Sequence, residues 1–161
     1  MHTIFFEKTS ELKRTKEELE KKLEVKITIQ GRKVTFSGDS LQEYEASIIL
    51  DAISFGFSAK KALFLKDENM IFRIINIKTF TRKKNLREVR ARVIGKEGKT
   101  KKTIENISNC HLIIKDKEIG VICSSESIEK LTTALSSLVR GAKQANTYRF
   151  LEKMNKNQRH V

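Results

Sequence analysis

Alternating hydrophobic and polar residues predict a β-hairpin in the first third of the chain. Apolar side chains occupy every second position over residues 25–29 and again over residues 34–36. A period of two is typical of strands with one buried face, and Gly31-Arg32 between the two runs supplies a turn. A further strand is expected over residues 3–6, Thr-Ile-Phe-Phe.

Helical spacing is found on both sides of this hairpin. Residues 15–18, Thr-Lys-Glu-Glu, have the form of a capping box, in which the threonine hydroxyl and a glutamate carboxylate accept bonds from each other's backbone amides. We therefore expect a helix from residue 15 to about Glu24, with Leu19 and Leu23 buried. After the hairpin, an amphipathic helix is expected between a cap at Asp39 and Gly56.

The same order of elements recurs about 85 residues later. The aligned pairs are Thr15 and Thr100, Leu19 and Ile104, Ile27 and Leu112, Ile29 and Ile114, Val34 and Ile119, Phe36 and Val121, and Gly56 and Gly141. A strand over residues 71–77 precedes this second set. Residues 86–92 predict a basic helix that has no counterpart in the first half, so the sequence predicts two related α+β units of unequal length.

The positive charge of the chain is concentrated in its second half. The 161 residues carry a formal net charge of +13, with a pI near 9.8. Residues 1–80 have 14 basic and 12 acidic side chains, net +2, and residues 81–161 have 19 and 8, net +11. A polyanion is the expected partner of the second half. A solvated helix face is the alternative interpretation of the basic run.

Several functional classes lack support in the sequence. No apolar run reaches the roughly 18 residues of a membrane span, the start does not match a secretory leader, and we expect a cytoplasmic protein. Cys110 and Cys123 are expected to be buried, reduced core residues. No ligand spacing predicts a metal site, no cofactor is implied, and no nucleophile, base or carboxylate pair predicts an enzyme.

Two of only seven glycines lie inside the basic run. The segment 93–100 reads Val-Ile-Gly-Lys-Glu-Gly-Lys-Thr, a Gly-x-x-Gly between two predicted helices. Glycine lets the backbone approach a phosphate closely, and the amides that open the next helix point toward the same anion. Lysines at positions 96, 99, 101 and 102 add charge around this loop.

The loop with its flanking strands and helices resembles the core of a KH domain. That resemblance implies a clamp on the backbone of about four single-stranded nucleotides, with bases against an apolar groove. The groove candidates are Ile94, Ile104, Ile113 and Ile114, for which plain core packing is the alternative. The expected RNA-binding residues are Arg87, Arg90, Arg92, Ile94, Gly95, Lys96, Glu97, Gly98, Lys99, Thr100, Lys101, Lys102, Ile113 and Arg149.

The whole chain resembles one family of tandem KH proteins, the partner-of-Nob ribosome-assembly factors, in their archaeal form. In the first half, Ser10-Glu11-Leu12-Lys13 stands where Gly-x-x-Gly would align. The resemblance implies an α+β protein of two type I KH-like domains, each a three-stranded sheet packed with helices. Residues 1–68 form a degenerate domain without the loop, residues 69–155 a domain with it, and residues 156–161 a flexible tail.

The same resemblance implies partners. The RNA partner is the 3′ region of the small-subunit ribosomal RNA precursor, and the implied protein partners are a Nob-type endonuclease and the alpha subunit of initiation factor two. A protein adaptor with loose RNA attachment, or a generic single-strand RNA binder, is the alternative. In the adaptor interpretation, residues 1–80 form the docking surface.

Overall fold

The computed structural model describes the backbone of residues 1–159 and the side chains of residues 1–156. The chain divides into two compact units, Met1–Glu68 and Asn69–Val161. Each unit has a three-stranded antiparallel sheet, in the orders β1-β3-β2 and β4-β6-β5. The predicted α+β class is confirmed, and in both sheets the last strand along the chain lies in the middle.

The first unit follows the order expected from its hydrophobic pattern. Its elements are β1 (His2–Phe5), α1 (Ser10–Leu23), β2 (Lys26–Gln30), β3 (Lys33–Ser37), α2 (Ser40–Phe55), α3 (Ala59–Ala62) and the 3₁₀ turn η1 (Leu63–Lys66). The predicted hairpin is confirmed, with its turn at Gly31-Arg32. Asp39 occupies the cap position of α2, although its side chain makes no capping bond, and α2 ends at Gly56 as predicted.

The capping box predicted at residue 15 is wrong. Helix α1 starts five residues earlier, at Ser10, and the Thr15 hydroxyl donates to the Glu11 carbonyl at 2.7 Å, a bond within the helix. The reason is Leu12, which is fully buried and extends the apolar face of Leu19 and Leu23 by two turns toward the N-terminus. Tertiary burial therefore outweighs the local capping signal.

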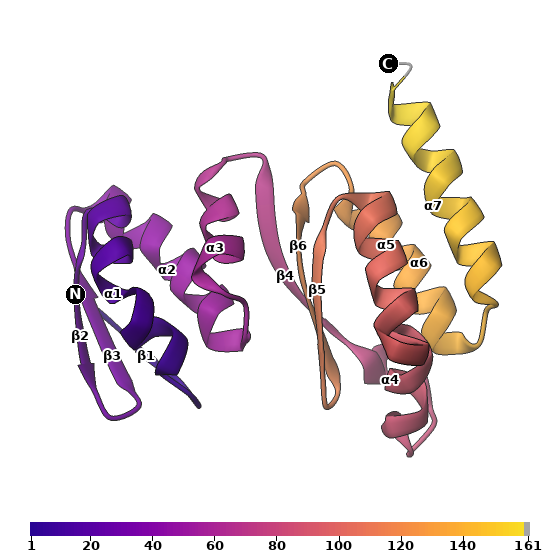
Figure 1. The fold of residues 1–161 in the computed structure, drawn as a ribbon, viewed down its shortest axis with the longest axis horizontal. Helices are drawn as coiled ribbons and strands as arrows, with labels where there is room; N and C mark the ends of the chain where they lie inside the picture. Colours follow the sequence, from indigo (N-terminus) through magenta and orange to yellow (C-terminus); the bar gives the residue numbers. More distant parts are fainter. Residues whose placement is uncertain (160–161) are drawn as a thin grey trace. The chain divides into compact units, whose positions relative to one another are not determined.

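The second unit is longer because of the elements that carry the glycine loop. Its elements are β4 (Met70–Asn76), η2 (Ile77–Thr79), α4 (Leu86–Ile94), η3 (Lys96–Gly98), α5 (Lys99–Ser108), β5 (His111–Lys115), β6 (Glu118–Ser124), α6 (Ile128–Arg140) and α7 (Gln144–Arg159). Helices α4, α5 and α6 cover one face of the sheet, and α7 packs on α5 and α6 (Figure 1). Residues 156–159 of the predicted tail are helical, and residues 160–161 lie outside the described residues.

Individual hydrogen bonds repeat between the units at a spacing of 85 residues. The Glu20 carboxylate accepts from the Ile27 amide at 2.9 Å, and the Glu105 carboxylate accepts from the Leu112 amide at 3.0 Å. The ion pairs behave alike, with Lys16 to Glu20 at 3.9 Å and Lys101 to Glu105 at 3.8 Å. Helices α3 and α7 also start 85 residues apart. Chance alignment of amphipathic elements does not produce such matched bonds.

Register locates the difference between the two units. His2 pairs with Phe36 in the first sheet, and Val121, the residue 85 positions after Phe36, pairs with Arg73. The first strands are therefore offset by 71 residues, and 85 − 71 leaves 14 additional residues between strand and helix in the second unit. These residues form η2, α4 and the glycine loop, whereas Ser10–Lys13 in the first unit is the first turn of α1.

The two matched carboxylates predict equal losses of stability. Replacing either Glu20 or Glu105 by alanine leaves a partly buried strand amide without its acceptor, which costs about 1–3 kcal/mol. Urea unfolding of each variant measures this cost, and the exposed Glu17, changed to alanine, is the matched control. A Glu105→Ala variant as stable as the control would show that the bond contributes nothing.

Candidate nucleic-acid interface

The Gly-x-x-Gly segment forms an ordered turn between α4 and α5. The Gly95 amide donates to the Ala91 carbonyl at 2.8 Å, and the Gly98 amide donates to the Gly95 carbonyl at 3.1 Å. Three of the four loop residues have positive φ: Gly95 at 77°, Glu97 at 57° and Gly98 at 74°. The backbone, rather than side chains, sets the shape of this loop.

Gly95 is required by close packing against the start of α5. A Cβ atom at this position would lie 2.1 Å from the Thr100 hydroxyl oxygen and 2.7 Å from the Thr100 backbone nitrogen. The Thr100 side chain is only 5% exposed, so this contact closes the inner side of the loop. Thr100, one of the predicted RNA-binding residues, therefore lies in the interior, where it positions Gly95.

Gly98 faces open space at the start of α5. No heavy atom lies within 4 Å of the position that its Cβ would occupy. Gly98 is also the N-cap residue of α5, and no side chain caps this helix end. The amides of the first helical turn and the positive end of the helix dipole thus face an open position, which is the arrangement that binds phosphate groups.

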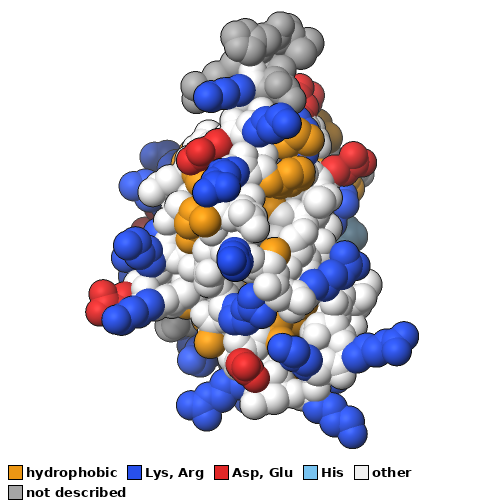
Figure 2. All heavy atoms as spheres, turned by 90° about the vertical axis from the view of Figure 1, so that its right-hand side faces the viewer, with side chains coloured by type: hydrophobic (Ala, Val, Ile, Leu, Met, Phe, Trp, Pro, Cys, Tyr) orange, Lys and Arg blue, Asp and Glu red, His pale blue; other side chains and the backbone are white. Residues whose placement is uncertain are grey.

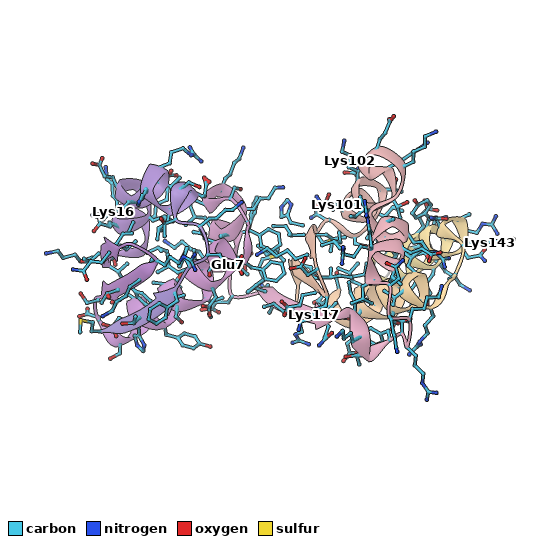
Figure 3. The ribbon with its side chains drawn as sticks, turned by 90° about the horizontal axis from the view of Figure 1, so that it is seen from below. Glu7, Lys16, Lys101, Lys102, Lys117 and Lys143 are labelled. Carbon is cyan, nitrogen blue, oxygen red and sulfur yellow. The ribbon has the colours of Figure 1, made fainter. Side chains whose placement is uncertain are left out.

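Exposed lysines surround this helix start. Lys96, Lys99 and Lys102 are exposed and form no ion pair within the described residues, while Lys101 pairs with Glu105. Figure 3 shows Lys101 and Lys102 together on one side of the second unit. Glu97 is exposed, as expected of a residue that should not face a phosphate. Three unpaired lysines therefore stand around the open helix start.

The predicted arginines of α4 divide into two kinds. Arg87 is exposed and has no ion-pair partner among the described residues. Arg90 donates to the Asp116 carbonyl in the β5–β6 turn, and Arg92 donates to the Ala142 carbonyl between α6 and α7 at 3.3 Å. Arg90 and Arg92 thus hold neighbouring elements in place, and Arg87 is the α4 arginine with its charge facing outward.

The apolar candidates also divide by the face on which they lie. Ile94 is half-buried, and it is absent from the residues that pack against the core. Ile114 packs partly against the core on the helix side of the sheet, as does the buried Leu112. Side chains alternate along a strand, so Ile113, whose partner on β6 is Gly120, faces the opposite side. The structure therefore brings Ile114, and not Ile113, to the helix face with Ile104.

The remaining candidates lie away from the loop or outside this chemistry. Arg149 is exposed on α7, which packs against α5 and α6. Burial raises the pKa of the Cys110 thiol to about 12 and that of Cys123 to about 11, so both stay protonated and unreactive at neutral pH. Within the described part of the chain, no group of three or more His, Cys, Asp or Glu side chains could hold a metal ion. None of the helices described has the length and apolar character that crossing a membrane requires.

Comparison with known families places the loop in a defined domain type. Residues 71–156 match the model of the second KH domain of PNO1, described as a eukaryotic type KH-domain, KH-domain type I. The matched segment contains the glycine loop and all of its flanking elements.

Curated relatives extend the similarity over most of the chain. The KH domain-containing protein MJ0443 of Methanocaldococcus jannaschii is 32% identical over 86% of this chain and 64% of its own length. The pre-rRNA-processing protein pno1 of Emericella nidulans is 29% identical over 83% of this chain and 55% of its own length. The chain thus spans somewhat more than half the length of these relatives.

Solved structures show the same fold over nearly the whole chain. Dim2p from Pyrococcus horikoshii is 30% identical, with a TM-score of 0.84 over 94% of this chain and 98% of that one. The same protein in a complex of a/eIF2alpha, aDim2p and rRNA is 29% identical, with a TM-score of 0.83 over 97% of this chain and 94% of that one.

Proposed function

The chain belongs to the PNO1 family of type I KH-domain proteins, and from this premise we propose that it binds single-stranded RNA as a ribosome-assembly factor. The proposed target is the 3′ region of the small-subunit ribosomal RNA precursor, and the proposed role is binding without catalysis. The observation that carries this proposal is the open start of α5, where Gly98 exposes uncapped amides among Lys96, Lys99 and Lys102. Relatives named for pre-rRNA processing, and an rRNA complex of a structural neighbour, point to the same class of target.

The proposed contacts follow from the positions of the candidate residues. The loop and the first turn of α5 hold the RNA backbone, with Arg87 alongside. Ile94 and Ile114 lie against the bases. Arg90, Arg92 and Thr100 act as positioning residues, because the fold already engages their side chains. Arg149 on α7 is proposed to reach flanking nucleotides.

We further propose that the two units are tandem KH-like domains, residues 1–68 and residues 69–155, and that the first has lost its RNA clamp. The bonds and elements repeated at 85 residues support a common origin for the units. The helical turn Ser10–Lys13 occupies the place of the loop, so the first unit offers no comparable set of free amides.

A protein-docking role for the first unit is supported by its exposed apolar residues. Leu41 and Tyr44 are 72% and 67% exposed, and they are neighbours three residues apart on α2. Large apolar side chains in adjacent exposed positions are typical of interaction sites. The proposed occupant is the alpha subunit of initiation factor two, as in the complex of the P. horikoshii neighbour, with a Nob-type endonuclease as a further candidate.

Cross-linking in cells tests the proposed function. We expect RNA cross-linked to the chain to be enriched at the 3′ end of small-subunit ribosomal RNA and its precursor. Proteins recovered from the same cells identify the partner of the first unit. Cross-links scattered over messenger RNAs would instead support a generic single-strand binder, and recovery of protein partners with no RNA would support the adaptor.

A further inference from the structure

Two long segments of the second unit contain basic side chains and no acidic ones. No Asp or Glu occurs over residues 69–87, which include Lys78, Arg82, Lys83 and Lys84. None occurs over residues 130–151, which include Arg140 and Lys143. The Gly-x-x-Gly loop is part of neither segment, so its phosphate site does not account for these charges.

The fold brings the two segments together beside α4. The guanidinium of Arg140, the last residue of α6, lies over the ring of Phe80 at 5.5 Å, and Phe80 itself packs against the core. On the same helix pair, Arg92 of α4 donates to the Ala142 carbonyl at 3.3 Å. Figure 2 shows Lys and Arg side chains predominating over the lower part of this side of the second unit.

Local hydrogen bonds order both segments. The Lys83 amide donates to the Thr81 hydroxyl at 3.2 Å, and the Leu86 amide donates to the Lys84 carbonyl at 3.2 Å. After α6, the Asn146 amide donates to the Lys143 carbonyl at 3.1 Å. Figure 3 shows Lys143 pointing outward. The cations are thus displayed on fixed backbone, which lowers the entropy lost when they bind an anion.

The chemistry of this surface differs from that of the single-strand groove. None of the large exposed hydrophobic residues of the described chain lies in either segment, so the surface offers nothing on which an unpaired base could stack. Side chains that contact only phosphates and sugars suit a double helix, whose bases are already paired. The loop before α4 is separated from the Gly-x-x-Gly loop by nine helical residues, or about 13 Å.

We propose that Lys78, Arg82, Lys83, Lys84, Arg140 and Lys143, here termed the basic surface, bind the backbone of an RNA double helix adjoining the single strand. This inference rests on the proposed function, because the single strand at the glycine loop positions the duplex. The basic surface adds affinity for strands that leave a helix, and so favours junctions between paired and unpaired RNA.

Binding measurements with two RNAs test the basic surface. The probes are a short single strand from the 3′ end of small-subunit ribosomal RNA and the same strand joined to a hairpin. We expect the wild-type chain to bind the hairpin RNA more tightly and with a steeper salt dependence, since each duplex phosphate contributes about −0.9 to the slope and each single-strand phosphate about −0.7.

The test variant replaces five of these residues by glutamine: Arg82, Lys83, Lys84, Arg140 and Lys143. Its affinity for the hairpin RNA is expected to fall at least about tenfold, while its affinity for the short strand stays within about twofold of wild type. A second variant changes only Arg82, Lys83 and Lys84, which leaves the Arg140–Phe80 contact intact if the first variant unfolds. The matched control replaces five exposed lysines of the first unit by glutamine: Lys13, Lys21, Lys26, Lys33 and Lys60.

Each outcome decides between the basic surface and the proposed function. Unchanged binding of the hairpin RNA by the folded variants would overturn the inference, as would an equal loss for both RNAs or an equal loss in the control. Loss of a protein partner with RNA binding intact would assign the surface to protein. Wild-type binding to the hairpin RNA without binding to the short strand would instead contradict the proposed function and leave the basic surface supported.

Discussion

Replacing Gly98 by aspartate is expected to lower RNA affinity about 100-fold, or about 2.8 kcal/mol, while the protein stays folded. The new carboxylate lies at the N-cap of α5, where it accepts the free amides and occupies the position proposed for phosphate. The fold tolerates it because the Cβ meets no atom within 4 Å and aspartate is among the residues that adopt a φ near 74°. Titration of the single-stranded RNA, with circular dichroism as the check on folding, measures both effects.

Gly98→Asn is the matched control for this substitution. Asparagine has nearly the same shape and tolerates the same backbone conformation, but it has no charge. We expect it to weaken binding far less than aspartate does. An aspartate variant that is folded and binds with wild-type affinity would remove the phosphate site from Gly98. Equal losses in both variants would assign the effect to shape instead of charge.

The two-unit architecture was predictable because strands and hairpins in this chain obey strict local rules. Alternation over residues 25–36 indicates one buried face, and the antiparallel pairing of β2 with β3 confirms the register that this alternation requires. The start of α1 was not predictable from the same rules. Thr15 has a good capping sequence, and only the three-dimensional core shows that Leu12 is buried as deeply as Leu19.

The candidate site was predictable in its backbone and less so in its side chains. Gly95 and Gly98 stood out because glycine is scarce in this chain, and the loop has the positive φ values that glycine favours. Long arginine side chains are different, since their targets lie far away in sequence. Arg90 reaches the β5–β6 turn and Arg92 reaches the α6–α7 connection, contacts that no local pattern encodes. Ile113 shows how a choice of one residue in a strand exchanges the two faces of a sheet.

The sequence carries a signal for the basic surface that a count of positive charge does not show. Lys83 and Arg140 belong to runs separated by more than fifty residues, and each run stands out by its lack of acids. Neither run alone defines a surface. Only the packing of Phe80 beneath Arg140 makes them one, and a single aromatic residue in a basic loop does not predict its partner.

Replacing Gly95 by alanine is expected to destabilise the second unit by about 3 kcal/mol or more, measured by urea unfolding. Forcing alanine into a φ of 77° costs about 1–2 kcal/mol, and overpacking against Thr100 adds about 1–3 kcal/mol. Gly98→Ala meets no atom, so it should carry the backbone cost alone, about 1 kcal/mol. Thr100→Ala in the Gly95→Ala background should restore only part of the stability, because the Thr100 backbone nitrogen would still lie 2.7 Å from the new methyl group. If Gly95→Ala and Gly98→Ala were equally stable, the close contact between Gly95 and Thr100 would have no part in holding the loop.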